Sequence, residues 1–324
     1  MTAPLSTEQP AVRATATPTQ RKGLRGRLGS SETRTLFSDA DLRRGEGPKI
    51  YFGLLALITV LFVIAFFFPI YWMVTGALKS PVELAQPTPT LIPHAIHWTY
   101  YKLAWTQLQI PHYLWNTTLY ALGAWFFQIV FDVAIAYALS RLKPLFGKII
   151  LALILSSLML PASALLVPAY LTVANVPFVH WNLLNTPWAL WLPGVANAFN
   201  IYILKRFFDQ IPQELMDAAS IDGAGRFRVL WSVVLPLSRP VLAVVSIFTV
   251  IGVWKDFLWP LLVLQDPKVQ TINVALARLS SSNERITQSE LLAGLVIASI
   301  PMVLIFIAFQ RHILRGLAAG AIKG

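Results

Sequence analysis

The chain contains no cysteine and little charge. Without Cys in its 324 residues, disulfides and thiolate metal sites are excluded. Charged residues make up 13% of the chain, about half of the roughly 25% that is usual in soluble domains. Hydrophobic residues make up 56%. This composition indicates a protein whose main solvent is lipid.

Stretches without Asp, Glu, Lys or Arg define the expected membrane crossings. A helix needs roughly 20 apolar residues to cross a bilayer, so the uncharged stretch Ile149–Leu204 is too long for one crossing. Its middle, Val173–Pro187, is rich in Asn and Pro and is expected to be a loop. The expected crossings are residues 50–74, 113–140, 150–171, 188–204, 240–264 and 291–310. The sequence therefore predicts an all-α, polytopic membrane protein with six transmembrane helices.

The basic residues predict the orientation of these crossings. Most of the 26 Lys and Arg residues lie in residues 1–49, in the loop 141–148, in the segment 205–239 and after residue 310. Lys and Arg concentrate in cytoplasmic loops, so both termini are expected in the cytoplasm of a protein of the cell membrane. The net charge of +11 then reflects topology, and no nucleic-acid partner is expected. Residues 1–48 are expected to form a disordered tail, and residues 49–324 the transmembrane domain.

The segment 211–239, here called the coupling loop, has the pattern of two short helices. Pro212 followed by Gln213 and Glu214 is typical of a helix start, and Gly223 or Gly225 would end the helix. A second short helix is expected from residue 226 to just before residue 236.

The first of these helices has residues that suit contact with another protein. The small Ala218 and Ala219 would let a second surface approach closely, and the acidic Glu214 and Asp217 could meet basic groups there. An ordinary amphipathic helix on the membrane surface would have a similar composition, and composition alone leaves both interpretations open.

The spacing within the coupling loop resembles that of a known family. ABC-importer permeases carry an EAA loop with the pattern E-A-A, three residues, G, nine residues, I-x-L-P. The matching residues are Asp217, Ala218, Ala219, Gly223, Val233, Leu235 and Pro236. Asp217 and Val233 depart from the pattern, but they keep the charge and the β-branched shape.

Three further stretches are similar to permeases of the carbohydrate-uptake branch, of the maltose-transporter inner-subunit type. They are AYALSR at 136–141, WKDFLWPLLVL at 254–264 and QRHILRGLAAGAIKG at 310–324. Lys255 stands where the family usually has Asn. The resemblance thus extends over about residues 50–324.

The resemblance implies a type I ABC-importer permease fold with a cytoplasmic EAA coupling helix. Its expected partners are a second permease subunit in a heterodimer, two ATP-binding-cassette ATPase subunits and an extracytoplasmic sugar-binding protein. The implied ATPase-coupling residues are Glu214, Asp217, Ala218, Ala219, Asp222, Gly223, Leu235 and Pro236. By this resemblance no catalytic residue and no cofactor is expected in this chain. Consistently, the sequence contains no GxxxxGK[ST] phosphate loop, so the nucleotide site is expected on the partner ATPase.

The implied cargo is a mono- or oligosaccharide, with a glycerol-phosphate-like or polyol solute as the alternative. An ion-coupled secondary transporter is a more distant alternative. It would need buried ion-coordinating acids and similar half-chains, and the sequence has no obvious internal repeat.

Charged and polar residues inside the expected crossings are candidates for the translocation path. Charge within lipid costs several kcal/mol, so Asp132, Trp254, Lys255 and Asp256 are predicted to line the path. The alternative for Lys255 is a position near the outer mouth, with its amine reaching water. No metal site is expected, although His94 and His97 have ligand-like spacing.

Overall fold

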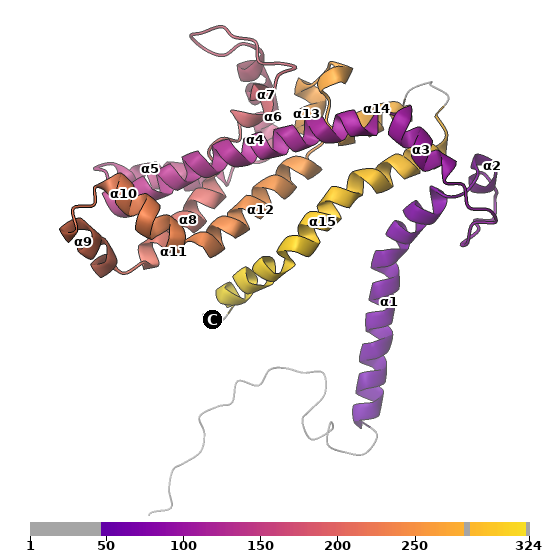
Figure 1. Cartoon of the computed structure of the whole chain (residues 1–324), viewed down its shortest axis with the longest axis horizontal. Helices are drawn as coiled ribbons and strands as arrows, with labels where there is room; N and C mark the ends of the chain where they lie inside the picture. The colour runs from indigo at the N-terminus through magenta and orange to yellow at the C-terminus, as the bar shows by residue number, and fades with distance from the viewer. Residues whose placement is uncertain (1–46, 282–285, 322–324) are drawn as a thin grey trace, which may run out of the picture. The chain divides into compact units, whose positions relative to one another are not determined.

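The computed structural model describes residues 47–281 and 286–321 of the chain (Figure 1). Within these ranges it contains helices and no strand. The helices are α1 (Gly47–Gly76), α2 (Pro81–Leu84), α3 (Thr99–Thr106), α4 (Ile110–Tyr137), η1 (Ala138–Leu142), α5 (Gly147–Ser157), α6 (Ala162–Ala174), α7 (Trp188–Trp191), α8 (Ala198–Gln210), α9 (Gln213–Ile221), α10 (Arg226–Val229), η2 (Leu230–Val234), α11 (Leu235–Leu237), α12 (Arg239–Lys255), α13 (Leu258–Val263), η3 (Pro267–Val269), α14 (Ile272–Ser281) and α15 (Gln288–Ala321).

The chain divides into two compact units, Met1–Ile64 and Ala65–Gly324. The described part of the first unit is the beginning of α1. Its aliphatic and aromatic side chains are exposed on every side of the helix, which is typical of a helix that faces lipid. The predicted tail, residues 1–48, lies outside the described residues except for its last two, which begin α1.

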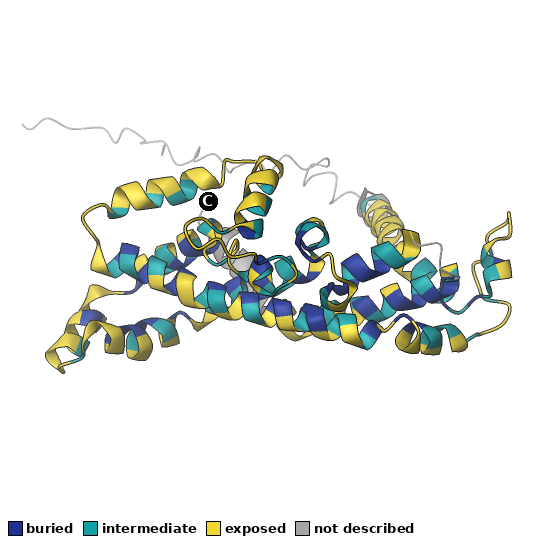
Figure 2. Cartoon of the chain, turned by 90° about the horizontal axis from the view of Figure 1, so that it is seen from above, coloured by how far each residue is buried: buried dark blue, intermediate teal, exposed yellow. Residues whose placement is uncertain are grey.

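In the second unit, α4 packs against α12, α8 and α7, and α15 packs against α3 and α12. Figure 2 shows the buried residues gathered where these long helices lie side by side. One buried cluster, the inner cluster, joins α4 and α8 to the coupling loop and α12. A second joins α3, α4, α14 and α15, and a third joins α4 to α6, α7 and α13. The helix α4 thus contributes residues to all three clusters.

Local sequence signals explain where the long helices begin. Gln109 adopts a left-handed conformation (φ 51) immediately before α4, and Pro111 occupies the first turn. Before α15, the backbone N–H of Thr287 donates to Glu290 Oε2 at 2.9 Å and the backbone N–H of Glu290 donates to Thr287 Oγ1 at 3.3 Å. This reciprocal pair is a capping box, which satisfies N–H groups that a helix start leaves unpaired.

Among the described residues, three helices are long and apolar enough to cross a membrane: Tyr51–Gly76, Ile110–Leu142 and Gln288–Gln310. They match the expected crossings 50–74, 113–140 and 291–310. Two bent pairs have the same composition, Gly147–Ser157 with Ala162–Ala174 at 106° and Arg226–Leu237 with Arg239–Lys255 at 81°. The expected crossing 150–171 is therefore bent in this structure. If each pair is one span, five helical spans meet the criteria of length and composition.

The expected crossing at 188–204 is not one continuous helix. It consists of α7 and the first part of α8, and the chain between them, residues 192–197, is not helical. Pro193 and Gly194 lie in this break, and both residue types disfavour helix interiors. Asn197 then starts α8, because its side-chain oxygen accepts hydrogen bonds from the backbone N–H groups of Phe199 and Asn200, both at 3.1 Å.

The expected crossing at 240–264 is also interrupted. The helix α12 ends at Lys255, and α13 begins at Leu258 after an extended residue, Asp256 (φ −66, ψ 136). The Asp256 carboxyl group faces the backbone N–H groups at the start of α13, where a helix presents unpaired donors. The carboxylate of Asp256 thus meets N–H groups that have no partner within α13.

The segment between α1 and α3 is folded around a buried carboxylate, Glu83. Its Oε1 accepts hydrogen bonds from Thr90 Oγ1 at 2.7 Å and from the backbone N–H of His94 at 3.2 Å. The hydrogen bond from Thr90, followed by burial acting in the opposite direction and by His94, leaves the pKa of Glu83 below its usual value. His94 Nδ1 lies 3.1 Å from the same oxygen. His94 thus pairs with Glu83, and no cluster of three metal-ligating side chains occurs among the described residues.

Gly123 on α4 lies in close contact with α7, so a larger side chain at this position should lower stability. A Cβ atom at Gly123 would lie 2.3 Å from the ring of Trp191, whose Nε1 donates to the carbonyl of Tyr120 at 3.1 Å. We expect Gly123→Ala to lower stability by about 1–3 kcal/mol through overpacking, measured as a lower Tm in detergent. The control is Gly252→Ala on α12, where a Cβ meets nothing within 4 Å. An equal Tm for both variants would contradict the prediction.

Candidate coupling surface and polar pocket

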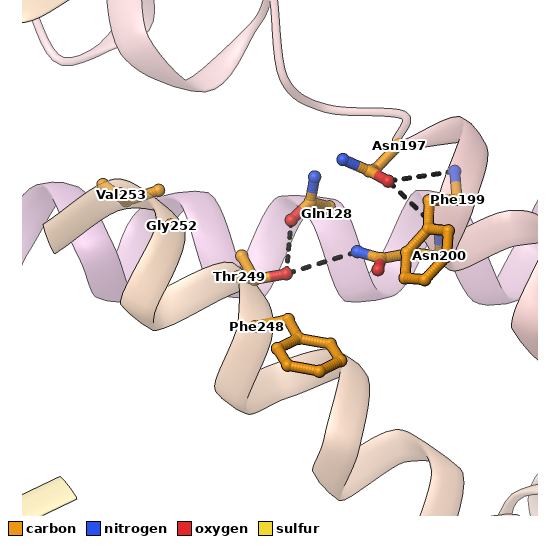
Figure 3. Close-up of a pocket in the computed structure, with 8 residues that line it drawn as sticks. All are labelled: Gln128, Asn197, Phe199, Asn200, Phe248, Thr249, Gly252 and Val253. Atoms are coloured by element: carbon orange, nitrogen blue, oxygen red, sulfur yellow. Dashed lines mark hydrogen bonds between the residues drawn. The ribbon is translucent and has the colours of Figure 1, made fainter. Parts of the chain in front are cut away.

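A pocket of about 450 Å³ lies between α4, α8 and α12 (Figure 3). Its lining comes from three parts of the sequence that the fold brings together. The lining residues are Gln128, Asn197, Phe199, Asn200, Phe248, Thr249, Gly252 and Val253. None of these eight side chains is charged, so the pocket offers amide, hydroxyl and aromatic groups.

Hydrogen bonds connect the polar side chains of the pocket across three helices. Asn200 Nδ2 donates to Thr249 Oγ1 at 3.4 Å, and Thr249 Oγ1 donates to Gln128 Oε1. Gln128 Nε2 donates to the backbone carbonyl of Gly194 at 2.8 Å. All three side chains are buried. Because buried amides need partners, this chain of hydrogen bonds orients the polar wall of the pocket.

Asp132 lies next to this pocket but is not among its lining residues. It follows Gln128 by one turn on α4, so the two side chains share a face of the helix. Its carboxylate is fully buried, and Oδ1 accepts a hydrogen bond from the backbone N–H of Asn197 at 2.8 Å. Asp132 therefore fixes the start of α8 beside the pocket.

The other predicted path residues, at the end of α12, lie just beyond the pocket. Trp254 is buried, and its carbonyl accepts a hydrogen bond from Asn273 Nδ2 at 2.8 Å. The side chain of Lys255 is exposed, and Asp256 lies in the break before α13. The residues that border the pocket are their neighbours Gly252 and Val253.

The polar pocket residues were not among the predicted site residues; they are Gln128, Asn197, Asn200 and Thr249. They carry no formal charge, and formal charge is the signal on which the path residues were predicted. One signal was present: Gln128 and Asp132 have the spacing of residues on the same helix face.

In the coupling loop, α9 presents an exposed acidic face. Glu214, Asp217, Ala218 and the capping residue Asp222 are all exposed. Asp217, Ala218 and Asp222 follow Glu214 by three, four and eight residues, which places all four along one side of the helix. Ile221, which is 86% exposed, lies beside them. The helix thus offers carboxylates around an apolar side chain, with small side-chain bulk at Ala218.

The opposite side of α9 packs onto the chain's own core. Met216 is buried in the inner cluster, and Ala219 is half-buried against it. The two alanines therefore lie differently: Ala218 faces outward, whereas Ala219 packs against the inner cluster of its own chain. Adjacent residues of a helix point about 100° apart, which explains the difference.

Gly223 ends α9 as the sequence predicted. It has a left-handed conformation (φ 79), and the N–H of Ala224 donates to the carbonyl of Ala219 at 2.9 Å. Glycine adopts this conformation without steric cost, which is why it is common just after a helix. A Cβ atom at Gly223 would meet nothing of this chain within 4 Å, so the outer side of the turn is open.

The second helix of the coupling loop runs further than predicted. It was expected to stop before Pro236, but helical structure continues to Leu237. The π-helical turn η2 precedes Pro236. A wider turn accommodates the missing N–H and the ring of a proline. Leu235 packs against the inner cluster, while Pro236 is exposed.

Helices that are long and apolar enough to cross a bilayer are typical of an integral membrane protein. Residues 132–319 match the family described as binding-protein-dependent transport system inner membrane component. This match covers more than half of the chain, and the chain belongs to this family. The family forms the transmembrane part of ABC importers, which work with an ATPase and a binding protein, so this protein is a transport subunit and not an enzyme.

Individual relatives agree with this assignment. The chain is 29% identical over 275 residues to the melibiose/raffinose/stachyose import permease protein MelC of Bacillus subtilis, covering 84% of this chain and 96% of MelC. It is 30% identical over 279 residues to the sn-glycerol-3-phosphate transport system permease protein UgpE of Yersinia enterocolitica, covering 84% and 96%.

A solved structure has the same fold. A chain in the crystal structure of a bacterial ABC transporter involved in the import of the acidic polysaccharide alginate superposes with a TM-score of 0.75. The match covers 86% of this chain and 99% of that chain, at 21% identity.

Proposed function

We propose that this permease subunit carries a neutral mono- or oligosaccharide, delivered by an extracytoplasmic binding protein, through the membrane. The observation that supports this most directly is the pocket between α4, α8 and α12. Its amide and hydroxyl groups suit the hydroxyl groups of a sugar. The exposed rings of Phe199 and Phe248 add apolar surface, which ligand sites combine with a few polar groups. The import of melibiose, raffinose and stachyose in the name of MelC points to the same cargo class.

A glycerol-phosphate-like solute is the second candidate, because UgpE is named for sn-glycerol 3-phosphate. A phosphate group in a protein site is usually met by Arg, Lys or backbone N–H groups. The eight lining residues of the pocket include no Arg or Lys. This composition favours the neutral sugar.

The proposed assembly is a heterodimer of this chain with a second permease subunit, bound to two ATPase subunits. In this assembly the exposed face of α9 docks on an ATPase, with Glu214, Asp217, Ala218, Asp222 and Gly223 at or near the contact. Exposed carboxylates beside the apolar Ile221 support such a docking surface, since interfaces combine an apolar centre with a polar rim. Leu235 and Pro236 would hold the second helix of the coupling loop behind α9.

The proposed topology has six crossings within residues 49–324, with both termini in the cytoplasm and residues 1–48 as a cytoplasmic tail. The distribution of Lys and Arg supports this orientation. In this proposal the crossing at 188–204 is formed by α7 and α8 together, with the break between them bordering the polar pocket. Non-helical backbone at membrane depth is tolerated where it lines such a cavity.

Two measurements on the tagged subunit test the proposed function. Purification from its native membrane in mild detergent should recover an ATP-binding-cassette ATPase, a second permease and a binding protein. The binding protein should then gain thermal stability with a neutral sugar from a panel and not with sn-glycerol 3-phosphate, because ligand binding stabilises the folded state. Stabilisation by sn-glycerol 3-phosphate alone would favour the second candidate, and recovery without any ATPase would contradict the importer itself.

A further inference from the structure

One end of α4 binds the chain on both sides of α9 through three side chains. These are Tyr137 at the end of α4 and Ser140 and Arg141 in the π-helical turn η1, and together they are called the α4 clasp. The coupling loop leaves α8 at Ile211 and returns to the core at α10. The α4 clasp contacts the chain at both of these points.

Arg141 holds the chain where α8 ends and α9 begins. Its Nη2 donates hydrogen bonds to the backbone carbonyls of Phe208 and of Ile211, the latter at 2.6 Å. Its Nη1 donates to Gln213 Oε1 at 3.1 Å. The last carbonyls of a helix have no partner within the helix and carry partial negative charge. A guanidinium fork meets several acceptors in fixed geometry, so Arg141 fixes the entry into α9.

Ser140 and Asp209 add a second attachment at the same place. Ser140 Oγ donates to Asp209 Oδ1 at 2.7 Å, and Lys205 Nζ donates to Asp209 Oδ2 at 2.7 Å. Partial burial would raise the pKa of Asp209, but the hydrogen bonds from Lys205 and Ser140 outweigh it and hold this pKa below its usual value. The carboxylate that accepts the bond from Ser140 is therefore ionised at neutral pH.

Tyr137 binds the chain that follows α9. Its hydroxyl group donates to the backbone carbonyl of Arg226 at 3.0 Å, at the first residue of α10. The ring is buried in the inner cluster, which also contains Met216 of α9 and Val229 of α10. Both connections of α9 are thus bound to the same turn and a half of one helix.

The same two helices are joined again at the polar pocket. Asp132 of α4 accepts the hydrogen bond from the N–H of Asn197, immediately before α8. The helix α8 is therefore attached to α4 at its start by Asp132 and at its end by the α4 clasp. Gln128, in the pocket wall, is about 13 Å along α4 from Tyr137 at 1.5 Å per residue. A regular helix of this length transmits displacement with little bending.

We propose that the α4 clasp makes α9, α8 and α4 move as one body, so that a displacement of α9 by the ATPase moves the polar wall of the pocket. This inference rests on the proposed docking of α9 on an ATPase. Tyr137, Ser140 and Arg141 are then positioning residues: they touch neither the cargo nor the ATPase. Replacing these side chains should let ATP hydrolysis continue with less transport, while the subunits of the importer stay assembled.

The test uses the complete importer, purified with its own ATPase, second permease and binding protein and reconstituted into proteoliposomes. The variants are Arg141→Lys, which keeps the charge and loses the fork, Tyr137→Phe, and both together. Lys148→Gln and Tyr202→Phe are the controls, since these side chains are exposed on α5 and α8. Solute taken up per ATP hydrolysed is the main readout, with membrane level, bound ATPase and Tm measured alongside.

Each single variant should bind the ATPase normally and hydrolyse ATP, but its uptake per ATP should fall about fivefold or more, in the range of a coupling free energy between sites. The controls should keep the wild-type ratio. A wild-type ratio in Arg141→Lys and Tyr137→Phe, or a loss of Tm and membrane level with an unchanged ratio, would overturn the inference and leave a purely structural role. A wild-type protein without a bound ATPase would instead contradict the proposed function.

Discussion

Replacing Gly223 by Asp is expected to stop uptake while the protein remains in the membrane. Within the chain, the new side chain would meet open space, and the left-handed backbone (φ 79) would add strain of about 1–2 kcal/mol for a residue with a Cβ. The larger effect is expected at the docking surface, where the side chain would separate α9 from the ATPase. Because central interface contacts contribute about 2 kcal/mol or more, uptake should fall roughly thirtyfold or more.

The matched control for this experiment is Gly225→Asp. Gly225 lies two positions further on with an ordinary backbone conformation (φ −69), and a Cβ there also meets nothing within 4 Å. Membrane level, co-purified ATPase and uptake should be measured for both variants. The expected difference is loss of bound ATPase and of uptake for Gly223→Asp only. Normal uptake by Gly223→Asp, or an equal loss in both variants, would argue against docking through the end of α9.

The second large effect is expected for Thr249→Val in the polar pocket. The hydroxyl group of Thr249 is the link between Asn200 and Gln128, and valine keeps the shape of the side chain without this link. Two buried amides would each lose a partner, at a cost of about 1–3 kcal/mol per unsatisfied group. Uptake of the sugar should therefore fall about tenfold, whereas ATPase binding and basal ATP hydrolysis should stay near wild type.

The matched control variant is Thr249→Ser, which tests the role of the hydroxyl group apart from that of the methyl group. Serine keeps the hydrogen-bonding hydroxyl and loses only a methyl group, so uptake by this variant should lie close to wild type. Initial uptake rates at several sugar concentrations would show the effect in proteoliposomes. If Thr249→Val transports as well as Thr249→Ser, the chain of hydrogen bonds through the pocket has no part in transport.

The sequence predicted the coupling loop better than the crossings, and the reason is physical. Pro212 and Gly223 are backbone signals, since each restricts or permits particular φ values, and α9 lies between them. The absence of charge, in contrast, reports only that a segment tolerates lipid. It does not detect interruptions, so the break at Pro193 and Gly194 and the extended residue Asp256 fell inside expected crossings.

The polar pocket could not be predicted from composition, because each of its residues is uncharged and none gives a functional signal by itself. Gln128, Asn200 and Thr249 come from three helices, and only packing brings their side chains within hydrogen-bonding distance. Charged residues within the crossings gave a clearer signal. In the structure Asp132 binds the start of α8 and Lys255 is exposed, and their place in the translocation path stays a prediction. The burial of Ala219 likewise depended on which side of α9 faces the core.

The outward-facing aromatic and aliphatic side chains of the coupling loop have a consequence for biosynthesis. Ile221, Phe227 and Trp231 are 86%, 82% and 69% exposed, and uncovered apolar surface of this kind promotes aggregation. In the proposed docking of α9 on an ATPase, part of this surface would be covered in the assembled importer. Subunits made in excess of the ATPase would then keep it uncovered and open to aggregation and proteolysis.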